Sequence, residues 1–381
     1  MSIGSELLIE SEGPLESLEP IEGEVAARSP WQLFWRRFRQ DRVAMASLGV
    51  IIGLILVAIA APLIVQLVGA PGPNVQNSNA LSTFGTATGP SHNALWPFIV
   101  VLAGGVVALI AAAAPWDVVR RYVPMAIGAV SVLAAVVLAA IFWPSAQHLF
   151  GVDPLGRDIF ARVLYGARIS LLVAFVATGL SMIVGVSLGM FAGYFRGGID
   201  MAISRVIDLL LAFPILLLAL GLASSCSLGH GCFGGLLKPG LIVVIFVIAF
   251  VNWTYIARIV RGQVLSLREK EFVEAARSLG ASNSRIIFRE ILPNLVAPII
   301  VYATLIIPQN ILFEAALSFL GAGVQPPTAS WGAMLADATT IFNQAWWYMV
   351  FPGAALLITV LAFNLVGDGL QDALHPKASS N

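Results

Sequence analysis

Three residues in one short, glycine-rich segment have the types and spacing to hold a metal ion or to form a covalent bridge. Cys226, His230 and Cys232 make the pattern C-x3-H-x-C. A structural zinc site takes four protein ligands, and this segment supplies no fourth. A disulfide between Cys226 and Cys232 is therefore the favoured interpretation if the segment faces an oxidising compartment, with free thiols as the alternative. We expect no metal site.

Two acidic residues lie inside long apolar stretches, where a charge is costly and so indicates either a transport pathway or a structural contact. Glu314 could attract a cationic substrate, or it could hydrogen-bond to a helix broken near Pro308. Asp208 could serve transport, or it could pair with Arg205 three residues earlier or with a helix N-terminus. Both interpretations stay open for each acid.

Arg157 and Asp158 form a charged pair directly before an apolar stretch that starts at Ile159. Aspartate is a favoured helix N-cap, so we expect a helix to begin at Ile159. The pair could also form an external rim that meets a protein delivering a solute.

Two well-known catalytic patterns are absent from the sequence. The phosphate-binding pattern G-x-x-x-x-G-K-[ST] needs a lysine, and none of the three lysines, Lys238, Lys270 and Lys377, fits it. The zinc-protease pattern H-E-x-x-H does not occur either. We therefore predict that this chain is not an enzyme.

Apolar helices must position all of these residues. The 381 residues are 58% hydrophobic and 11% charged, with a mean hydropathy of +0.88, whereas a soluble domain has about 25% charged residues. The formal net charge of zero gives no indication of nucleic-acid binding. Because a helix of about 20 apolar residues can cross a bilayer, we predict an all-α polytopic membrane protein. It has eight spans, at about 45–68, 96–114, 123–143, 168–194, 205–223, 240–257, 295–319 and 347–366.

The basic residues predict which way the spans run, because lysine and arginine are retained on the cytoplasmic side. With the N-terminus inside, 17 of the 21 basic residues fall in cytoplasmic segments. The other four are Arg157, Arg162, Arg168 and Lys238. Both termini are then cytoplasmic, and Cys226 and Cys232 lie outside, where a disulfide is favoured.

The N-terminal region divides into a tail and an amphipathic helix. Seven glutamates within the first 24 residues predict a disordered acidic cytoplasmic tail over 1–28 rather than a signal peptide. Ser29, Pro30 and Gln32 then match a capping box, which predicts a helix over 29–44. Its helically spaced aromatic residues predict an interfacial helix that contacts membrane lipid and sets topology. They are Trp31, Phe34, Trp35 and Phe38.

The longest predicted cytoplasmic loop, 258–294, is patterned as a helical hairpin. A first helix is predicted over 269–279, and Gly280 supplies a left-handed turn after it. Ser282 or Asn283 can then cap a second predicted helix, which runs to Leu292 and ends before Pro293. The result is two short helices that stand off the membrane.

One face of the first predicted helix is apolar. Its small residues suit insertion into a groove of another protein, where close backbone approach matters. The alternative is that this face packs on the chain's own helix ends, and the pattern alone favours neither. The face consists of Phe272, Ala275, Ala276 and Leu279.

This hairpin resembles the EAA loop of permease subunits in binding-protein-dependent ABC importers. The resemblance rests on Glu274-Ala275-Ala276, Gly280 and Ile291-Leu292-Pro293. In that family the loop docks into a cleft on a separate ATPase subunit. When the ATPase subunits close, the loop transmits their movement to the membrane helices. The resemblance implies that Glu274, Ala275, Ala276 and Gly280 provide the ATPase contact and the turn.

Further stretches resemble the dipeptide, oligopeptide and nickel group of these permeases, and within it the C-type subunit. They fall within 29–68 and 148–377 and include Phe150 to Leu171, Asp208 to Pro214, Glu314 to Gly321, Trp331-Gly332 and Gly367 to Leu374. The resemblance implies a six-span type I ABC importer permease core, with its EAA loop in 148–377. The chain departs from the family in 69–147, where we predict an external loop plus two extra transmembrane helices. A short tail, 378–381, follows.

The resemblance also implies partners and an activity. The expected partners are a homologous second permease in a heterodimer, two ATPase subunits and an extracytoplasmic substrate-binding protein, in a bacterial inner membrane. ATP and Mg would be used by the partner subunits, with no cofactor on this chain. The expected activity is import of di- or oligopeptides by alternating access.

Three other functions remain open. Within the same family, the cargo could be nickel or another non-peptide solute. A self-sufficient ion-coupled secondary transporter is the alternative from another class, although such proteins ordinarily show paired broken helices and ion-coordinating acids at mid-membrane. An assembly protein without transport would leave the hairpin unexplained.

Overall fold

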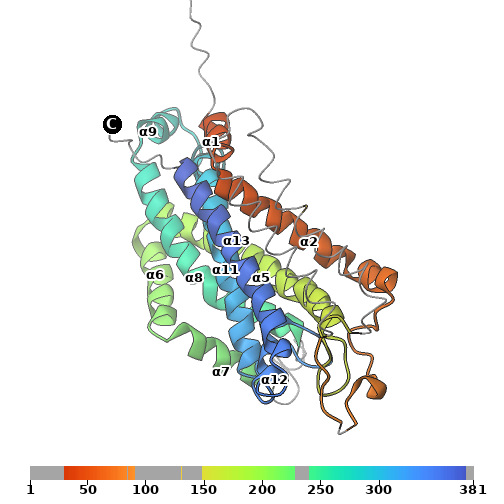
Figure 1. Cartoon of the computed structure of the whole chain (residues 1–381). Helices are drawn as coiled ribbons and strands as arrows, with labels where there is room; N and C mark the ends of the chain where they lie inside the picture. Colours follow the sequence, from red (N-terminus) through yellow and green to blue (C-terminus); the bar gives the residue numbers. More distant parts are fainter. Residues whose placement is uncertain (1–29, 84, 91–129, 131–147, 228–239, 375–381) are drawn as a thin grey trace, which may run out of the picture.

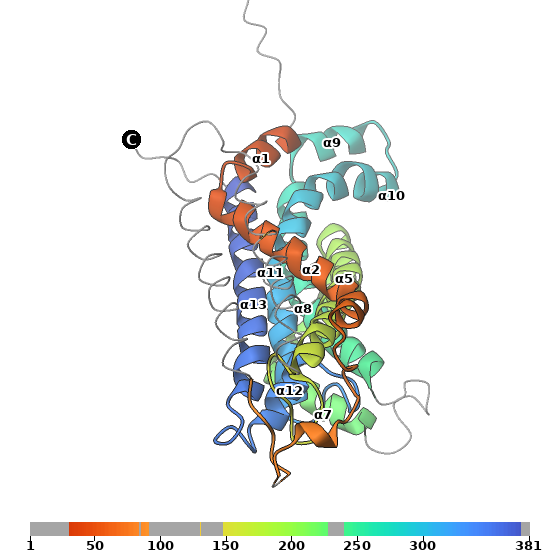
Figure 2. The ribbon, with the colours of Figure 1, turned by 45° about the vertical axis from the view of Figure 1, so that its right-hand side comes forward.

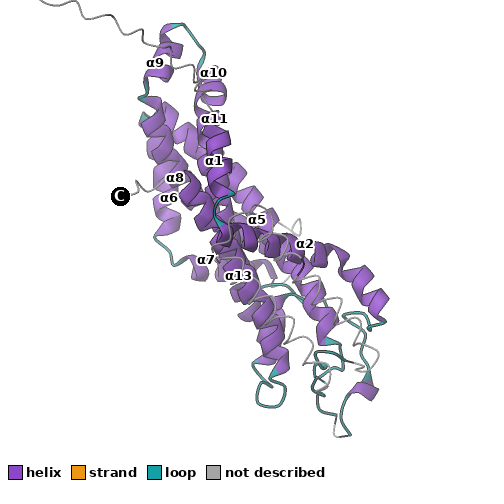
Figure 3. Cartoon of the chain, turned by 45° about the horizontal axis from the view of Figure 1, so that its top comes forward, coloured by secondary structure: helices purple, strands orange, loops and turns teal. Residues whose placement is uncertain are grey.

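Long helices lie side by side along most of the part of the chain that the structure describes (Figures 1 and 3). The structure is a computed structural model, and it describes residues 30–83, 85–90, 130, 148–227 and 240–374. Within these ranges the only β-pairing consists of two isolated bridges. The predicted tail over 1–28 and, apart from residue 130, the two predicted spans at 96–114 and 123–143 lie outside the described residues.

Five helices among the described residues are long and apolar enough to cross a membrane. Each overlaps one predicted span, and the bent pair described next corresponds to a sixth. The predicted all-α membrane fold is confirmed. The five helices are α2 (Arg42–Val68), α5 (Ile159–Phe195), α8 (Leu241–Arg268), α11 (Leu292–Phe319) and α13 (Trp347–Leu374).

The predicted span over 205–223 is not one continuous helix. The chain instead forms α6 (Gly197–Leu211) and α7 (Ile215–Ser227), which are bent by 86° at the break between them. Pro214 is the cause, because it has no N–H to donate, its ring collides with the carbonyl four residues earlier, and it disfavours helical geometry at Phe213. The pair still passes as one broken span by length and composition.

α5 and α8 pack closely because glycines line the α5 side of their contact. A Cβ added at Gly189 would lie 2.7 Å from the carbonyl oxygen of Ala257. At Gly185 or Gly193 it would lie 2.6 or 2.8 Å from the Cβ of a β-branched residue of α8. Such distances are too short for any side chain, so glycine at every fourth position lets the two helices touch through their backbones. We call Gly185, Gly189 and Gly193 the glycine ridge.

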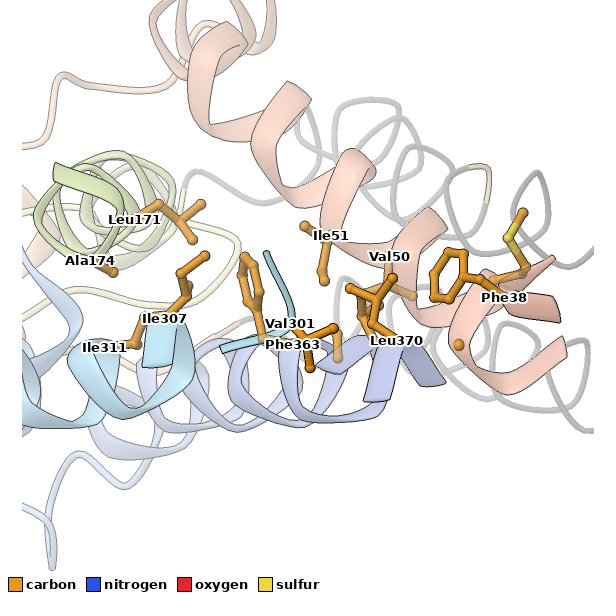
Figure 4. Packing of buried hydrophobic residues seen from close by; sticks show 14 of the residues in the cluster. Phe38, Val50, Ile51, Leu171, Ala174, Val301, Ile307, Ile311, Phe363 and Leu370 are labelled. Atoms are coloured by element: carbon orange, nitrogen blue, oxygen red, sulfur yellow. The ribbon is translucent and has the colours of Figure 1, made fainter. Parts of the chain in front are cut away.

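An apolar core joins α2, α5, α11 and α13 to the N-terminal helix α1 (Pro30–Phe38). Figure 4 shows Phe38 of α1 beside Val50 of α2 and Leu370 of α13. The helix begins at Pro30, as predicted, but Phe38 is 1% exposed and packs on protein rather than on lipid. Trp35 stays 39% exposed and is free to meet the membrane interface.

The two ends of the bundle carry different elements (Figure 2). At the hairpin end lie α1 and the short helices α9 (Glu271–Ser278) and α10 (Asn283–Arg285). At the opposite end, which we call the α12 end, lie α12 (Trp331–Ala338), α7 and the segment around the 3-10 turn Ser78–Ala80. α5 runs from the α12 end to the hairpin end.

The glycine ridge predicts a stability difference between two glycines of α5. Gly189→Leu forces α5 away from Ala257, and overpacking of this kind costs about 1–3 kcal/mol. Gly179→Leu is the matched control, because a Cβ added there meets nothing within 4 Å. Thermal unfolding of the purified protein in detergent should therefore show a lower midpoint for Gly189→Leu alone. Equal midpoints for the two variants would show that the ridge does not hold the helices together.

Candidate functional site

The predicted hairpin is present, and its first arm is α9. The arm ends at Gly280, whose φ of +78° lies in the left-handed region that glycine adopts without a steric penalty. The N–H of Ala281 reaches back to the carbonyl of Ala276 at 3.0 Å and closes the turn. Ser282 then caps α10 by accepting a hydrogen bond from the N–H of Arg285. The predicted glycine turn is confirmed, and of the two candidate caps, Ser282 and Asn283, the structure has Ser282.

The second arm differs from its prediction. It does not end before Pro293 but continues through a π-helical turn, Ile286–Ile291, into α11. Pro293 lies in the first turn of α11, directly after the π-helical turn. The hairpin is therefore joined to a membrane helix without a break, as α9 is to α8 across only Glu269 and Lys270.

The predicted apolar face of the first arm divides between two surfaces. Ala276 is half-buried on the hairpin's own cluster, and Val273, which the prediction left out, is fully buried there. Phe272 and Leu279 are 39% and 89% exposed, and Ala275 is exposed between them. Packing on the chain's own helices therefore accounts for Ala276 only. The other three leave an apolar patch open on a protruding hairpin, which is the surface that protein partners cover.

Glu314 lies at the centre of a buried hydrogen-bond network rather than in an open pathway. Its carboxyl group accepts hydrogen bonds from Ser170 of α5 at 2.9 Å and from Ser318 of α11 at 2.7 Å, and it is 0% exposed. Each serine hydroxyl accepts a backbone N–H in turn, that of Trp331 at 3.3 Å and that of Val324 at 3.1 Å. Through these two serines, Glu314 connects α5 and α11 to Val324 and to Trp331, the first residue of α12. Of the two interpretations, this arrangement matches the structural one, with serines in place of a broken helix.

A second polar contact lies one helical turn away and was not predicted. Asn310 donates to the hydroxyl of Thr178 at 2.7 Å and accepts from Asn252 of α8. Asn310, Glu314 and Ser318 recur at intervals of four on α11, so they share one helix face. That spacing was visible in the sequence and could have indicated a polar seam between α11 and α5.

Asp208 pairs with Arg258 of another helix rather than with Arg205, which was one of the partners that the sequence left open. Its carboxylate accepts from Arg258 of α8 at 2.7 Å, and both side chains are more than half exposed. α6 packs on α8, which brings together residues 50 positions apart. An ion pair this exposed contributes little to stability.

Asp158 caps α5 as predicted, by accepting the N–H of Ala161 at 2.7 Å. It also contacts His148 at 3.0 Å. Burial raises the pKa of Asp158 above its ordinary value, although both of these hydrogen bonds oppose the rise. Arg157 bonds to buried Asp153 at 2.6 Å, so the predicted external rim is largely an internal structure.

Cys226, near the end of α7, is disulfide-bonded and 2% exposed. The chain contains one other cysteine, Cys232. Cys232 and His230 lie outside the described residues.

Two family models match the chain. The model described as binding-protein-dependent transport system inner membrane component matches residues 185–380, which include α6 to α13 and the whole hairpin. The model described as N-terminal TM domain of oligopeptide transport permease C matches residues 29–81.

Several named relatives are similar to more than half of the chain. The dipeptide transport system permease protein DppC of Alkalihalophilus pseudofirmus is 48% identical over 237 residues, which cover 62% of this chain and 74% of the relative. The glutathione transport system permease protein GsiD of Pectobacterium atrosepticum is 43% identical over 237 residues, covering 62% and 75%. Among solved structures, the MetNI methionine ABC transporter aligns at 20% identity with a TM-score of 0.47, over 56% of this chain and 96% of that chain.

The network at Glu314 predicts a structural role that can be separated from a pathway role. Glu314→Ala leaves two buried hydroxyl groups without an acceptor, at about 1–3 kcal/mol for each unsatisfied group. Glu314→Gln keeps one accepting oxygen and should lose less. Thermal unfolding in detergent should rank wild type above Glu314→Gln and Glu314→Ala lowest, with Gln309→Ala, an exposed position of the same helix, as the unaffected control. An unchanged midpoint with lost uptake of cationic peptides would instead support the pathway role.

Proposed function

The chain belongs to the family of binding-protein-dependent transport system inner membrane components, and we propose that it is one of two permease subunits in an ATP-driven importer of di- or oligopeptides. The observation that carries this proposal is the hairpin, which is fixed to two membrane helices and exposes an apolar patch away from the bundle. A permease driven by a separate ATPase needs such a part, because the force must enter the membrane helices through a protein contact.

The patch suits docking for three physical reasons. Leu279 and Phe272 remove apolar area from water when a partner covers them, which is worth about 25 cal/mol per Å². Ala275 between them is small enough to allow close backbone approach. Val273 and Ala276 hold the opposite face of α9 against the chain, so the arm can transmit a push rather than fold away.

Coupling to ATP is then a shift between two conformations. ATPase subunits that bind ATP and Mg close together, and closure displaces the docked hairpins and favours one state of the membrane helices. We place ATP hydrolysis on those separate subunits, with no cofactor held by this chain. Glu274, Ala275 and Ala276 of the first arm and Gly280 at its turn are the proposed coupling residues.

The peptide cargo is proposed from the relatives. Dipeptide and glutathione, itself a small peptide, are the solutes that the relatives' names specify. A nickel or other non-peptide cargo is the alternative within the family, and an external binding protein would select among them.

The orientation is part of the proposal. We place the hairpin end and both termini in the cytoplasm and the α12 end outside, in a bacterial inner membrane. The excess of arginine near the hairpin supports this placement. The disulfide-bonded Cys226 supports it as well, because disulfides persist in oxidising compartments and α7 lies at the α12 end.

A self-sufficient secondary transporter is less well supported. An acidic group at membrane depth that is free to take up a coupling ion would favour such a protein. Glu314 is enclosed by two serines, and Asp208 is paired with Arg258.

Co-purification tests the proposal. The tagged chain, extracted from its own membrane in mild detergent, should bring with it an ATPase pair and a homologous second permease. An extracytoplasmic binding protein should join the complex when a peptide is added. Purification of this chain alone, or as a homo-oligomer active without an ATPase, would contradict the proposal.

One substitution tests the docking patch itself. Ala275→Trp should abolish recovery of the ATPase subunits and ATP-driven uptake, because the bulky ring prevents close approach, while the chain still inserts and folds. Ala202→Trp, on an exposed alanine of α6, is the matched control and should retain both. Normal ATPase recovery and uptake by Ala275→Trp would show that the hairpin docks elsewhere.

A further inference from the structure

Tyr194, near the end of α5, contacts the chain on both sides of the α9 arm. Arg268, the last residue of α8, donates from Nη1 to the carbonyl oxygen of Tyr194 and lies over its ring, 5.7 Å from the centroid. The Tyr194 hydroxyl donates to Oδ1 of Asn283, the first residue of α10, at 2.8 Å. The segment 269–282, which contains α9 and the glycine turn, is therefore tied at both ends to one residue.

The environment of Tyr194 makes this tie specific. Its side chain is 5% exposed and packs in the same cluster as Val264, Val273 and Ile286, so the ring is held on all sides. A buried phenol stays satisfied only if its hydroxyl reaches a partner. Here that partner is Asn283, which is itself exposed on the hairpin.

A neighbouring ion pair adds little to the tie. Arg196 pairs with Glu269, but their side chains are 47% and 62% exposed, and ion pairs in water contribute little. The buried tyrosine is the stronger connection between α5 and the arm.

We propose that Tyr194 is a positioning residue for energy coupling: it joins α5 to the hairpin, so that a displacement of the arm moves α5 together with α8 and α11. The proposal rests on the proposed function. α8 and α11 are linked to the arm through the backbone, whereas α5 has no covalent link there and depends on side-chain contacts. Tyr194 supplies contacts to both flanks of the arm at once.

α5 is the helix through which such a displacement can reach the far side of the molecule (Figure 2). It extends for 37 residues to its cap at Asp158. The glycine ridge holds it against α8, and Ser170 connects it to Glu314 and to the start of α12. Movement received at Tyr194 is thereby passed to the end where solute enters in the proposed orientation.

The experiment compares transport with ATP hydrolysis in the complete complex, reconstituted in liposomes with its ATPases, second permease and binding protein. Tyr194→Phe keeps the packed ring and loses only the hydroxyl. The amount of peptide taken up per ATP hydrolysed should fall about three- to tenfold, which is the change in an equilibrium constant that the net free energy of one hydrogen bond produces. Asn283→Ala removes the acceptor and should give the same fall, and the double variant should fall no further, because both act through one contact.

Two further variants separate positioning from stability. Asn283→Asp keeps an accepting oxygen and should restore the uptake per ATP that Asn283→Ala loses. Tyr255→Phe, on a half-exposed tyrosine of α8, is the matched control and should behave as wild type. The unfolding midpoint of Tyr194→Phe should stay close to that of wild type.

Three results would overturn the inference: unchanged uptake per ATP in Tyr194→Phe, no rescue by Asn283→Asp, or losses that follow a fall in the unfolding midpoint. An unmodified complex without ATP-driven uptake would contradict the proposed function itself, and this inference with it.

Discussion

The backbone contact between α5 and α8 is the constraint on which the rest of the structure depends. Glycines at 185, 189 and 193 bring the two helices so close that no side chain fits between them. In a membrane, where lipid is as apolar as leucine, close packing of this kind is a main source of helix association. α8 leads into the hairpin, and α5 reaches the α12 end. The contact between them therefore joins the hairpin and the α12 end into one unit.

Buried polar contacts determine how the other helices attach to this unit. Glu314 and Asn310 of α11 bond to Ser170 and Thr178 of α5, where few alternative partners exist. An unsatisfied polar group in this environment costs more than the bond contributes, so these contacts select one arrangement of α11 against α5. The apolar packing of these helices, as in Figure 4, removes surface area from water but does less to determine how the helices are oriented.

Local rules predicted the features that depend on neighbouring residues. Hydropathy located the spans that lie within the described residues, Asp158 indicated the start of α5, and Gly280 indicated the turn of the hairpin. Features that depend on distant residues were missed. Arg258 lies 50 positions from Asp208 and meets it because α6 packs on α8, an arrangement that no pattern of neighbouring residues indicates.

The hairpin shows the same limit on a smaller scale. Periodicity indicated an amphipathic helix but could not decide which side faces the protein, because Val273 and Phe272 are both apolar and adjacent. Burial of Val273 under the second arm decides it, and that depends on where the π-helical turn directs Ile286. The exposed side is the part that supports an ATPase contact.

The central claim is that solute moves through this chain at the expense of ATP hydrolysed on other subunits. The most direct measurement is uptake of a labelled dipeptide into liposomes that contain this chain, with and without its co-purified partners, under ATP or under an imposed ion gradient. Our account predicts uptake only with the partners and ATP present. Uptake by this chain alone, driven by a proton or sodium gradient, would contradict it.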